Sequence, residues 1–235
     1  MLAIFKKEMR SYFTGVIGYA FLVIFLAVGA TLFCLTTLLS MTADVSTYFV
    51  YMMVFSGVML PLLTMKSFSE ERKIKTEQLV LTSPVSLVSM VMGKFLAATA
   101  VFAGATLLSS LSFIILYRYA SVKTAMLLGN FVALLLVGIT FISIGMFVSS
   151  LTENQLAAAV GTIGIILAFL GVGVLTSLIP SNYWIRFVFD SLSIFTRFQS
   201  FTNGYFDFSS VLFYLSVSAI FLYLTVRVYD RRRHG

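Results

Sequence analysis

The sequence predicts an all-α integral membrane protein with six transmembrane helices. Of its 235 residues 60% are hydrophobic and only 11% are charged, and the mean hydropathy is +1.02. Soluble domains are about 25% charged, and their cores could not absorb this much apolar surface. In addition, six apolar runs approach the length of a membrane-spanning helix. The whole chain, residues 1–235, is interpreted as one transmembrane domain.

The N-terminal segment, residues 1–14, predicts an amphipathic helix. Apolar residues recur at helical spacing on one side and basic residues fall on the other, which is typical of a helix in the inner membrane interface. The apolar set is Leu2, Phe5, Met9 and Tyr12, and the basic set is Lys6, Lys7 and Arg10. A cleavable signal peptide is the alternative. The apolar run that follows continues to Leu39, well beyond the roughly 7–15 residues of a signal sequence, so a retained first span is favoured.

Six spans follow in order, because a hydrocarbon core about 30 Å thick needs about 20 apolar residues in a helix. The second is short and contains Pro61, which predicts a kink covered by neighbouring helices. The predicted spans are Val16–Leu39, Tyr48–Met65, Phe95–Tyr117, Ala125–Val148, Leu156–Leu178 and Phe208–Val228.

Basic residues indicate the orientation. With the N-terminus inside, 12 of the 16 Lys and Arg residues lie in inner segments, and only Arg118, Lys123, Arg186 and Arg197 lie in outer ones. Lys and Arg concentrate on the cytoplasmic side of membrane proteins, so both termini are predicted to be cytoplasmic. The net charge of +7 is explained in the same way, and we expect no nucleic-acid partner.

Several function classes lack their usual residues. Almost no ionisable residue lies deep in a predicted span, whereas ion-coupled carriers generally carry such groups near the midplane. The only histidine, His234, is next to the C-terminus, and the only cysteine, Cys34, lies in an apolar run. Gly93-Lys94 lacks the upstream glycine and the following Ser or Thr of a P-loop. We therefore expect no catalytic residue, no metal site and no cofactor bound by this chain.

Charged residues are rare in this sequence, but residues 66–86 carry seven of the 25. Ser67 followed by Glu70 matches a capping box, in which the serine caps a helix and the glutamate reaches back to the free amide. Glu70 and Glu71 in the first turn would also suit the positive end of the helix dipole. A cytoplasmic helix is predicted here, ending near Leu81.

The end of this segment predicts a sharp turn into a second helix. Ser83 would cap that helix and Pro84 would occupy its first position, where a proline is well tolerated. A solvated loop with a few ion pairs is the alternative interpretation. The apolar run at 79–81 favours a helix that docks on a partner, because a fully solvated helix has no need of three consecutive apolar residues.

The stretch FSEERKIKTEQLVLTSPVSLVSMVMGK resembles the signature of ABC-2 type permeases, in the branch of gliding-motility-associated and copper-enzyme-maturation permeases. A second stretch, FQSFTNGYFDFSSVLFYLSV at 198–217, is similar to the F-x-x-F-x-x-G-x-x-D pattern and last span of that branch. These two separated matches lie within one six-span layout, and with that layout the resemblance covers essentially the whole chain. The first match rests on Glu70, Glu71, Arg72, Thr76, Glu77, Leu79, Leu81, Thr82, Pro84, Val85, Ser86, Gly93 and Lys94.

The resemblance implies a coupling role for the charged segment. Such permeases pair with a separate cytoplasmic ATPase subunit, which binds ATP and Mg, and residues 66–86 would be the coupling helix seated on it. Residues 1–14 would be the elbow helix, with Lys6, Lys7 and Arg10 on its basic side. The loop at 149–155 would be a lesser contact. The residues expected to meet the ATPase are Glu70, Glu71, Arg72, Lys73, Thr76, Glu77, Leu81, Pro84 and Glu153.

The resemblance also implies further partners and a location. Six spans make half of a pathway, so a second permease chain is expected. A heteromeric pair is favoured over two identical chains, and the partner chain could carry an extracytoplasmic domain. The membrane would be the bacterial cytoplasmic one, and the function export or extrusion of a substrate. A force-transducing or assembly subunit of an envelope machine remains the alternative, as does a structural membrane protein without an ATPase.

The outer segment, residues 179–207, is too polar to span a membrane and unusually aromatic. Tyr183, Trp184, Phe187 and Phe189 suit the headgroup layer. Similar permeases have short re-entrant helices here that close the outer end of the pathway. Interfacial anchoring and an outer gate are equally favoured by these residues.

Overall fold

The computed structural model describes the chain except for residues 42–43, 77–85, 120–123, 179–192, 205–206 and 235. Every regular element within the described residues is helical. The elements are α1 (Leu2–Thr14), α2 (Val16–Phe33), the π-helix η1 (Cys34–Leu38), α3 (Ser46–Thr64), α4 (Lys66–Lys73), α6 (Leu87–Ser109), α7 (Ser112–Tyr119), α8 (Thr124–Leu151), α9 (Gln155–Leu178), α11 (Ile194–Thr202) and α12 (Phe208–His234).

Six of the described stretches are long and apolar enough to cross a membrane, which confirms the predicted all-helical class and its six spans. Helix α6, which contains the third span, begins at Leu87, because the Ser86 hydroxyl accepts a hydrogen bond from the Ser89 amide and starts the helix there. Lys94 lies in the second turn of this helix. The last helix likewise continues beyond Val228 to His234.

Helix α8 is the centre of the bundle. It packs against α3, α6, α9, α11 and α12, and its sequence is apolar on every side, as expected for a helix with neighbours all round. By contrast, fewer than a third of the residues in the spans of α2, α9 and α12 are buried, and each of these helices has exposed large apolar side chains. Exposed apolar faces of this extent mark surfaces that meet lipid or another chain.

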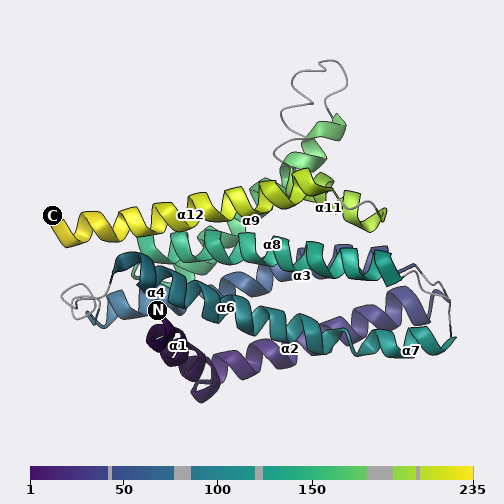
Figure 1. Cartoon of the computed structure of the whole chain (residues 1–235), viewed down its shortest axis with the longest axis horizontal. Helices are drawn as coiled ribbons and strands as arrows, with labels where there is room; N and C mark the ends of the chain where they lie inside the picture. Colours follow the sequence, from purple (N-terminus) through teal and green to yellow (C-terminus); the bar gives the residue numbers. More distant parts are fainter. Residues whose placement is uncertain (42–43, 77–85, 120–123, 179–192, 205–206, 235) are drawn as a thin grey trace.

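The two ends of the bundle differ (Figure 1). One end holds both chain termini, α1, α4 and the short connection between α8 and α9; it is called the terminal end below. The opposite, far end holds η1, α7 and α11. Helix α1 lies beside the starts of α2 and α6 rather than continuing either of them. The predicted N-terminal amphipathic helix is thus present as a separate element.

The charged helix is shorter than predicted. We expected it to reach Leu81, but α4 ends at Lys73, and Lys75 has a φ of +58°. This left-handed backbone is incompatible with a continuing right-handed helix, so a turn follows α4. Thirteen residues named in the sequence analysis lie outside the described residues: Glu77, Leu79, Leu81, Thr82, Ser83, Pro84, Val85, Lys123, Tyr183, Trp184, Arg186, Phe187 and Phe189.

Candidate functional site

The start of α4 is built differently from the predicted capping box. Met65, which joins α3 to α4, is itself helical with φ −55° and ψ −34°, so the two helices are nearly continuous. Ser67 therefore lies inside α4, and its side chain caps nothing. Glu70 and Glu71 likewise fall after the first turn. The capping box was wrong because it assumed that the chain leaves the helical conformation before Ser67.

A serine from another helix supplies the missing cap. The Ser149 hydroxyl of α8 accepts hydrogen bonds from the amides of Phe68 and Ser69, both at 3.1 Å. The same hydroxyl donates to the Met65 carbonyl at 3.0 Å. The first amides of a helix have no partner within it, and here α8 satisfies two of them. Helix α4 is consequently attached to the centre of the bundle.

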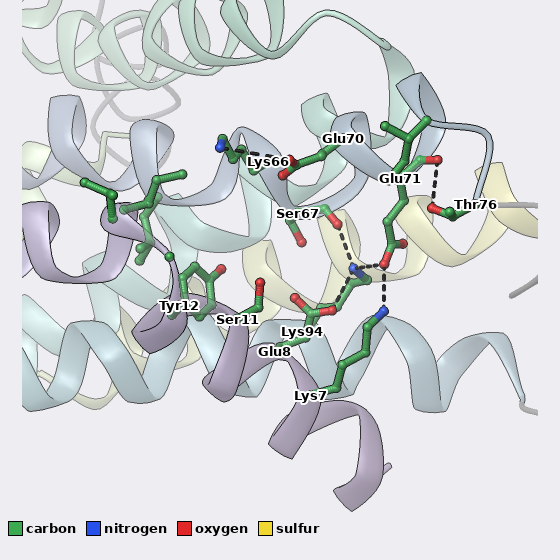
Figure 2. A pocket seen from close by; sticks show the side chains of 15 residues that line it. Lys7, Glu8, Ser11, Tyr12, Lys66, Ser67, Glu70, Glu71, Thr76 and Lys94 are labelled. Carbon is green, nitrogen blue, oxygen red and sulfur yellow. Dashed lines mark hydrogen bonds and ion pairs between the residues drawn. The ribbon is translucent and has the colours of Figure 1, made fainter.

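A buried lysine joins α4 to two further helices. The Lys94 side chain of α6 is only 3% exposed, and its ammonium forms an ion pair with the Glu71 carboxylate at 2.9 Å and donates a hydrogen bond to the Glu8 carboxylate at 3.1 Å. Its third bond is to the Ser67 carbonyl at 2.7 Å. Lys7 also contacts Glu71, at 3.3 Å. Figure 2 shows the side chains of Lys7, Glu8, Glu71 and Lys94, called the Lys94 cluster, converging from α1, α4 and α6.

The cluster satisfies the charge that it buries. An ammonium group has three donors, and Lys94 uses all three. The two glutamates carry two negative charges, and Lys7 with Lys94 supplies two positive ones. The Lys94 ammonium also lies 5.1 Å from the centre of the Phe68 ring, within the range of a cation–π contact. A charge this deeply buried is tolerated only with such partners.

Gly93 allows α1 to approach α6 closely. A Cβ atom at this position would lie 2.9 Å from the Ile4 Cγ2 atom and 3.0 Å from the Ile4 Cβ atom. Real Cβ atoms hardly ever come that close, so any side chain here would push α1 outward. The Gly-Lys pair of the sequence thus has two parts: Gly93 admits α1, and Lys94 binds Glu8 on it.

Two arginines tie the end of α8 to its neighbours. Arg72 of α4 donates to the Leu151 carbonyl at 3.0 Å and contacts the Glu153 carboxylate at 2.9 Å. Arg232 of α12 donates to the Ser150 carbonyl at 2.7 Å. The last carbonyls of a helix lack partners within it and carry its negative dipole end, so arginines are well suited to this position.

The predicted contact residues divide into two groups. Glu71 points into the Lys94 cluster with its side chain only 16% exposed, and Arg72 points toward α8 and Glu153. Lys73 is exposed, Glu70 is 46% exposed, and Glu153 is 61% exposed. Thr76 is partly buried, and its hydroxyl donates to the Glu71 carbonyl. On α1, Lys6 and Arg10 are exposed.

Four important residues were not predicted as site residues from the sequence: Glu8, Ser149, Arg232, and Lys94, which was named only as part of the family resemblance. Only Glu8 carried a usable signal. It lies three residues after Phe5 and four before Tyr12, on the apolar side of the predicted amphipathic helix, where a carboxylate needs a cation as partner. Ser149 and Arg232 are ordinary residues for a helix end, and their roles come from the packing.

A cavity of about 720 Å³ lies beside the Lys94 cluster, between α1, the start of α2, the end of α3, and α4. Ser11 and Tyr12 line it from α1, and Lys66 and Glu70 line it from α4 (Figure 2). Burial raises the pKa of the Tyr12 hydroxyl above its ordinary value, and the Glu8 carboxylate raises it further. Tyr12 is therefore a protonated hydrogen-bond donor at any physiological pH.

The F-x-x-F-x-x-G-x-x-D pattern forms the connection from α11 to α12 at the far end. Phe198 and Phe201 are buried, Gly204 adopts φ +84°, and Asp207 caps α12 by accepting from the Ser209 amide at 3.0 Å. The hydrogen bond from the Ser210 hydroxyl, together with those from the Ser209 and Ser210 amides, lowers the pKa of the Asp207 carboxyl. Each fixed residue of the pattern therefore has a structural role: two pack, one turns the chain, and one starts the last span.

The fold and this site define a multi-pass helical membrane protein that holds a short charged helix at one end of the bundle. The model of the family described as ABC-2 family transporter protein matches residues 2–233, nearly the whole chain. The chain belongs to this family, and is thus a permease-type membrane protein. A comparison with curated proteins finds no match.

Proposed function

We propose that this chain is the membrane subunit that couples ATP hydrolysis by a separate cytoplasmic ATPase to the export or extrusion of a substrate. The family implies an ATPase partner, and that partner would bind the ATP and Mg. The observation that carries the proposal is the attachment of α4 to four other helices. A push on α4 would reach several spans at once.

The attachments of α4 are of three kinds. It continues α3 through the helical Met65, so that rotation of α4 acts directly on the second span. Charge-assisted bonds hold it to α1 and α6 through Glu71, and these are stronger than neutral ones. Helix α4 is also held to α8 by hydrogen bonds, since its amides donate to the Ser149 hydroxyl and Arg72 donates to the Leu151 carbonyl. Such a junction suits a coupling helix better than a free loop.

The exposed side of α4 is the surface that we expect to meet the ATPase. Lys73 lies there, and Glu70 and Ile74 (61% exposed), which also line the cavity, are exposed at the same helix and its end. Glu153, in the connection after α8, contacts Arg72 of α4. Glu71 has a different role within the same proposal. Because it faces Lys94, it positions α4 relative to α1 and α6 and does not itself offer a surface to the partner.

A second permease chain belongs to the proposal as well. The exposed apolar faces of α2, α9 and α12 leave room for such a chain beside lipid. A heteromeric partner with an extracytoplasmic domain, and the gliding-motility or copper-enzyme branch, stay predictions based on the sequence resemblance. A force-transducing role would use the same α4 junction.

Site-specific photo-crosslinking in the native membrane tests the coupling assignment. A crosslinker at Lys73 should capture a P-loop ATPase, identified by mass spectrometry, whereas one at Ser40, exposed at the far end, should not. An ATPase captured from both positions, or from neither, contradicts the assignment of α4.

Cysteine labelling tests the orientation independently. With Cys34→Ser as the background, Lys73→Cys should react with an impermeant maleimide only from the cytoplasmic side, and Ser40→Cys only from the opposite side. The positive-inside count is the physical reason. The reverse pattern would overturn the topology.

A further inference from the structure

The cavity between α1 and α4 combines an apolar wall with a polar one. Val16, Ile17 and Leu63 form the apolar wall where the first span starts and the second ends. The polar lining is formed by the four residues of the Lys94 cluster together with Ser11, Tyr12, Lys66, Ser67, Glu70 and Thr76. A cavity with both kinds of wall, at the edge of a membrane-spanning bundle, suits an amphiphile whose apolar part continues along the spans.

The charged side chains of the cavity differ in how strongly they are paired. Lys94, Glu8, Glu71 and Lys7 satisfy one another within the Lys94 cluster. Lys66 and Glu70 are joined only by a 4.0 Å contact, at the limit of an ion pair, and their side chains are 37% and 46% exposed. Such exposed pairs contribute about 0–1 kcal/mol, so a ligand can separate them at little cost.

One cation and one anion a few ångströms apart are complementary to a zwitterion. A phosphate would accept from the Lys66 ammonium and from the Ser11 and Tyr12 hydroxyls, and a primary ammonium would donate to the Glu70 carboxylate. A purely anionic headgroup would place negative charge next to Glu70, and a quaternary ammonium has no N–H to donate to it. The volume also fits, since small-molecule sites range from about 300 to 1,000 Å³.

We propose that this cavity binds a membrane phospholipid whose headgroup carries a primary ammonium beside its phosphate. The lipid would come from the bilayer itself, because α1 is an amphipathic helix of the type that lies in the interface. Its headgroup touches both α1 and α4. The bound lipid therefore stabilises the position of α4, which makes lipid composition a factor in the activity of the complex.

Native mass spectrometry of the purified full-length chain, titrated in mixed micelles, tests this binding. The probes are phosphatidylethanolamine, phosphatidylcholine and phosphatidylglycerol with the same acyl chains. We expect phosphatidylethanolamine to be retained about tenfold more strongly than either of the others, the equivalent of one charge-assisted hydrogen bond. Equal retention of all three, or preference for phosphatidylglycerol, overturns the proposal.

Variants locate the site. Glu70→Gln should remove the preference for phosphatidylethanolamine, and Lys66→Gln should weaken the retention of all three lipids, whereas Lys73→Gln, on the same helix but outside the cavity, should change neither. Both cavity residues are exposed enough for their glutamine variants to fold, and size-exclusion profiles check this. If both cavity variants retain the three lipids as the parent chain does, the cavity is not the lipid site. The same conclusion follows if these variants lose only the ATPase in the photo-crosslinking experiment and keep their lipid binding.

Free phosphoethanolamine distinguishes a headgroup site from a lipid site. Without acyl chains it should compete only weakly, since the wall of Val16, Ile17 and Leu63 would stay uncovered. Full competition at matched concentration would mean that the cavity recognises a soluble phosphate ester, and would overturn the assignment to a membrane lipid.

Discussion

Replacing Lys94 by methionine tests whether the buried cluster holds the terminal end together. Methionine has a similar length but no charge, so the helix and the packing volume are largely kept. The substitution removes two hydrogen bonds of 2.7 and 3.1 Å and a 2.9 Å ion pair, and it leaves the Glu8 and Glu71 carboxylates without their shared cation. The fold should survive, but α1 and α4 should separate more easily from α6.

The magnitude follows from burial. Breaking a buried ion pair by removing one partner costs about 3–5 kcal/mol. Glu8 and Glu71 are 13% and 16% exposed, so both retain some water and Lys7 still neutralises one of them. We therefore expect the lower value, about 3 kcal/mol of unfolding free energy.

Unfolding in mixed micelles of mild detergent and SDS measures this free energy. Limited proteolysis near α1 measures how readily α1 separates from α6. Lys6→Met is the matched control, because Lys6 is exposed on the same side of the bundle. The triple variant Lys94→Met with Glu8→Gln and Glu71→Gln should recover part of the loss, since neutral amides do not repel each other. Residues in one network are not additive. If Lys94→Met costs no more than Lys6→Met, or if the three losses simply add, the cluster does not stabilise this end.

Two further predictions concern the other contacts. Ser149→Ala should destabilise the protein by about 1–3 kcal/mol, because two buried amides of α4 lose their acceptor. Ser150→Ala is the control, since the Ser150 hydroxyl donates to the Phe147 carbonyl of the same helix. Equal effects of the two substitutions in the same unfolding assay would contradict the capping role. Gly204→Ala should lower the free energy of unfolding by about 1–2 kcal/mol, because φ +84° is strained for an L-residue. Gly164→Ala is the control and should lower it by nothing, because there is open space around Gly164. If Gly204→Ala leaves thermal unfolding unchanged, the assigned turn is refuted.

The sequence alone determined the features that depend on local composition and periodicity. Six spans follow from the lengths of the apolar runs, and the amphipathic α1 follows from the spacing of its apolar and basic residues. The F-x-x-F-x-x-G-x-x-D pattern was identified only as a family resemblance, and the structure showed the turn at Gly204 and the helix cap at Asp207. The orientation and the docking residues of α4 stay predictions.

Only the tertiary structure decided how the charged helix is held. The sequence predicted that Ser67 caps α4 and that Glu71 lies on its surface, yet Ser149 supplies the cap and Glu71 faces Lys94. These partners are far apart in the chain, and nothing in the local pattern reports which groups meet across packed helices. A buried ammonium must nevertheless find carboxylates. Packing of α1 against α6 at Gly93 brings Glu8 to Lys94, and for that physical reason the cluster could be found only once the helices were in place.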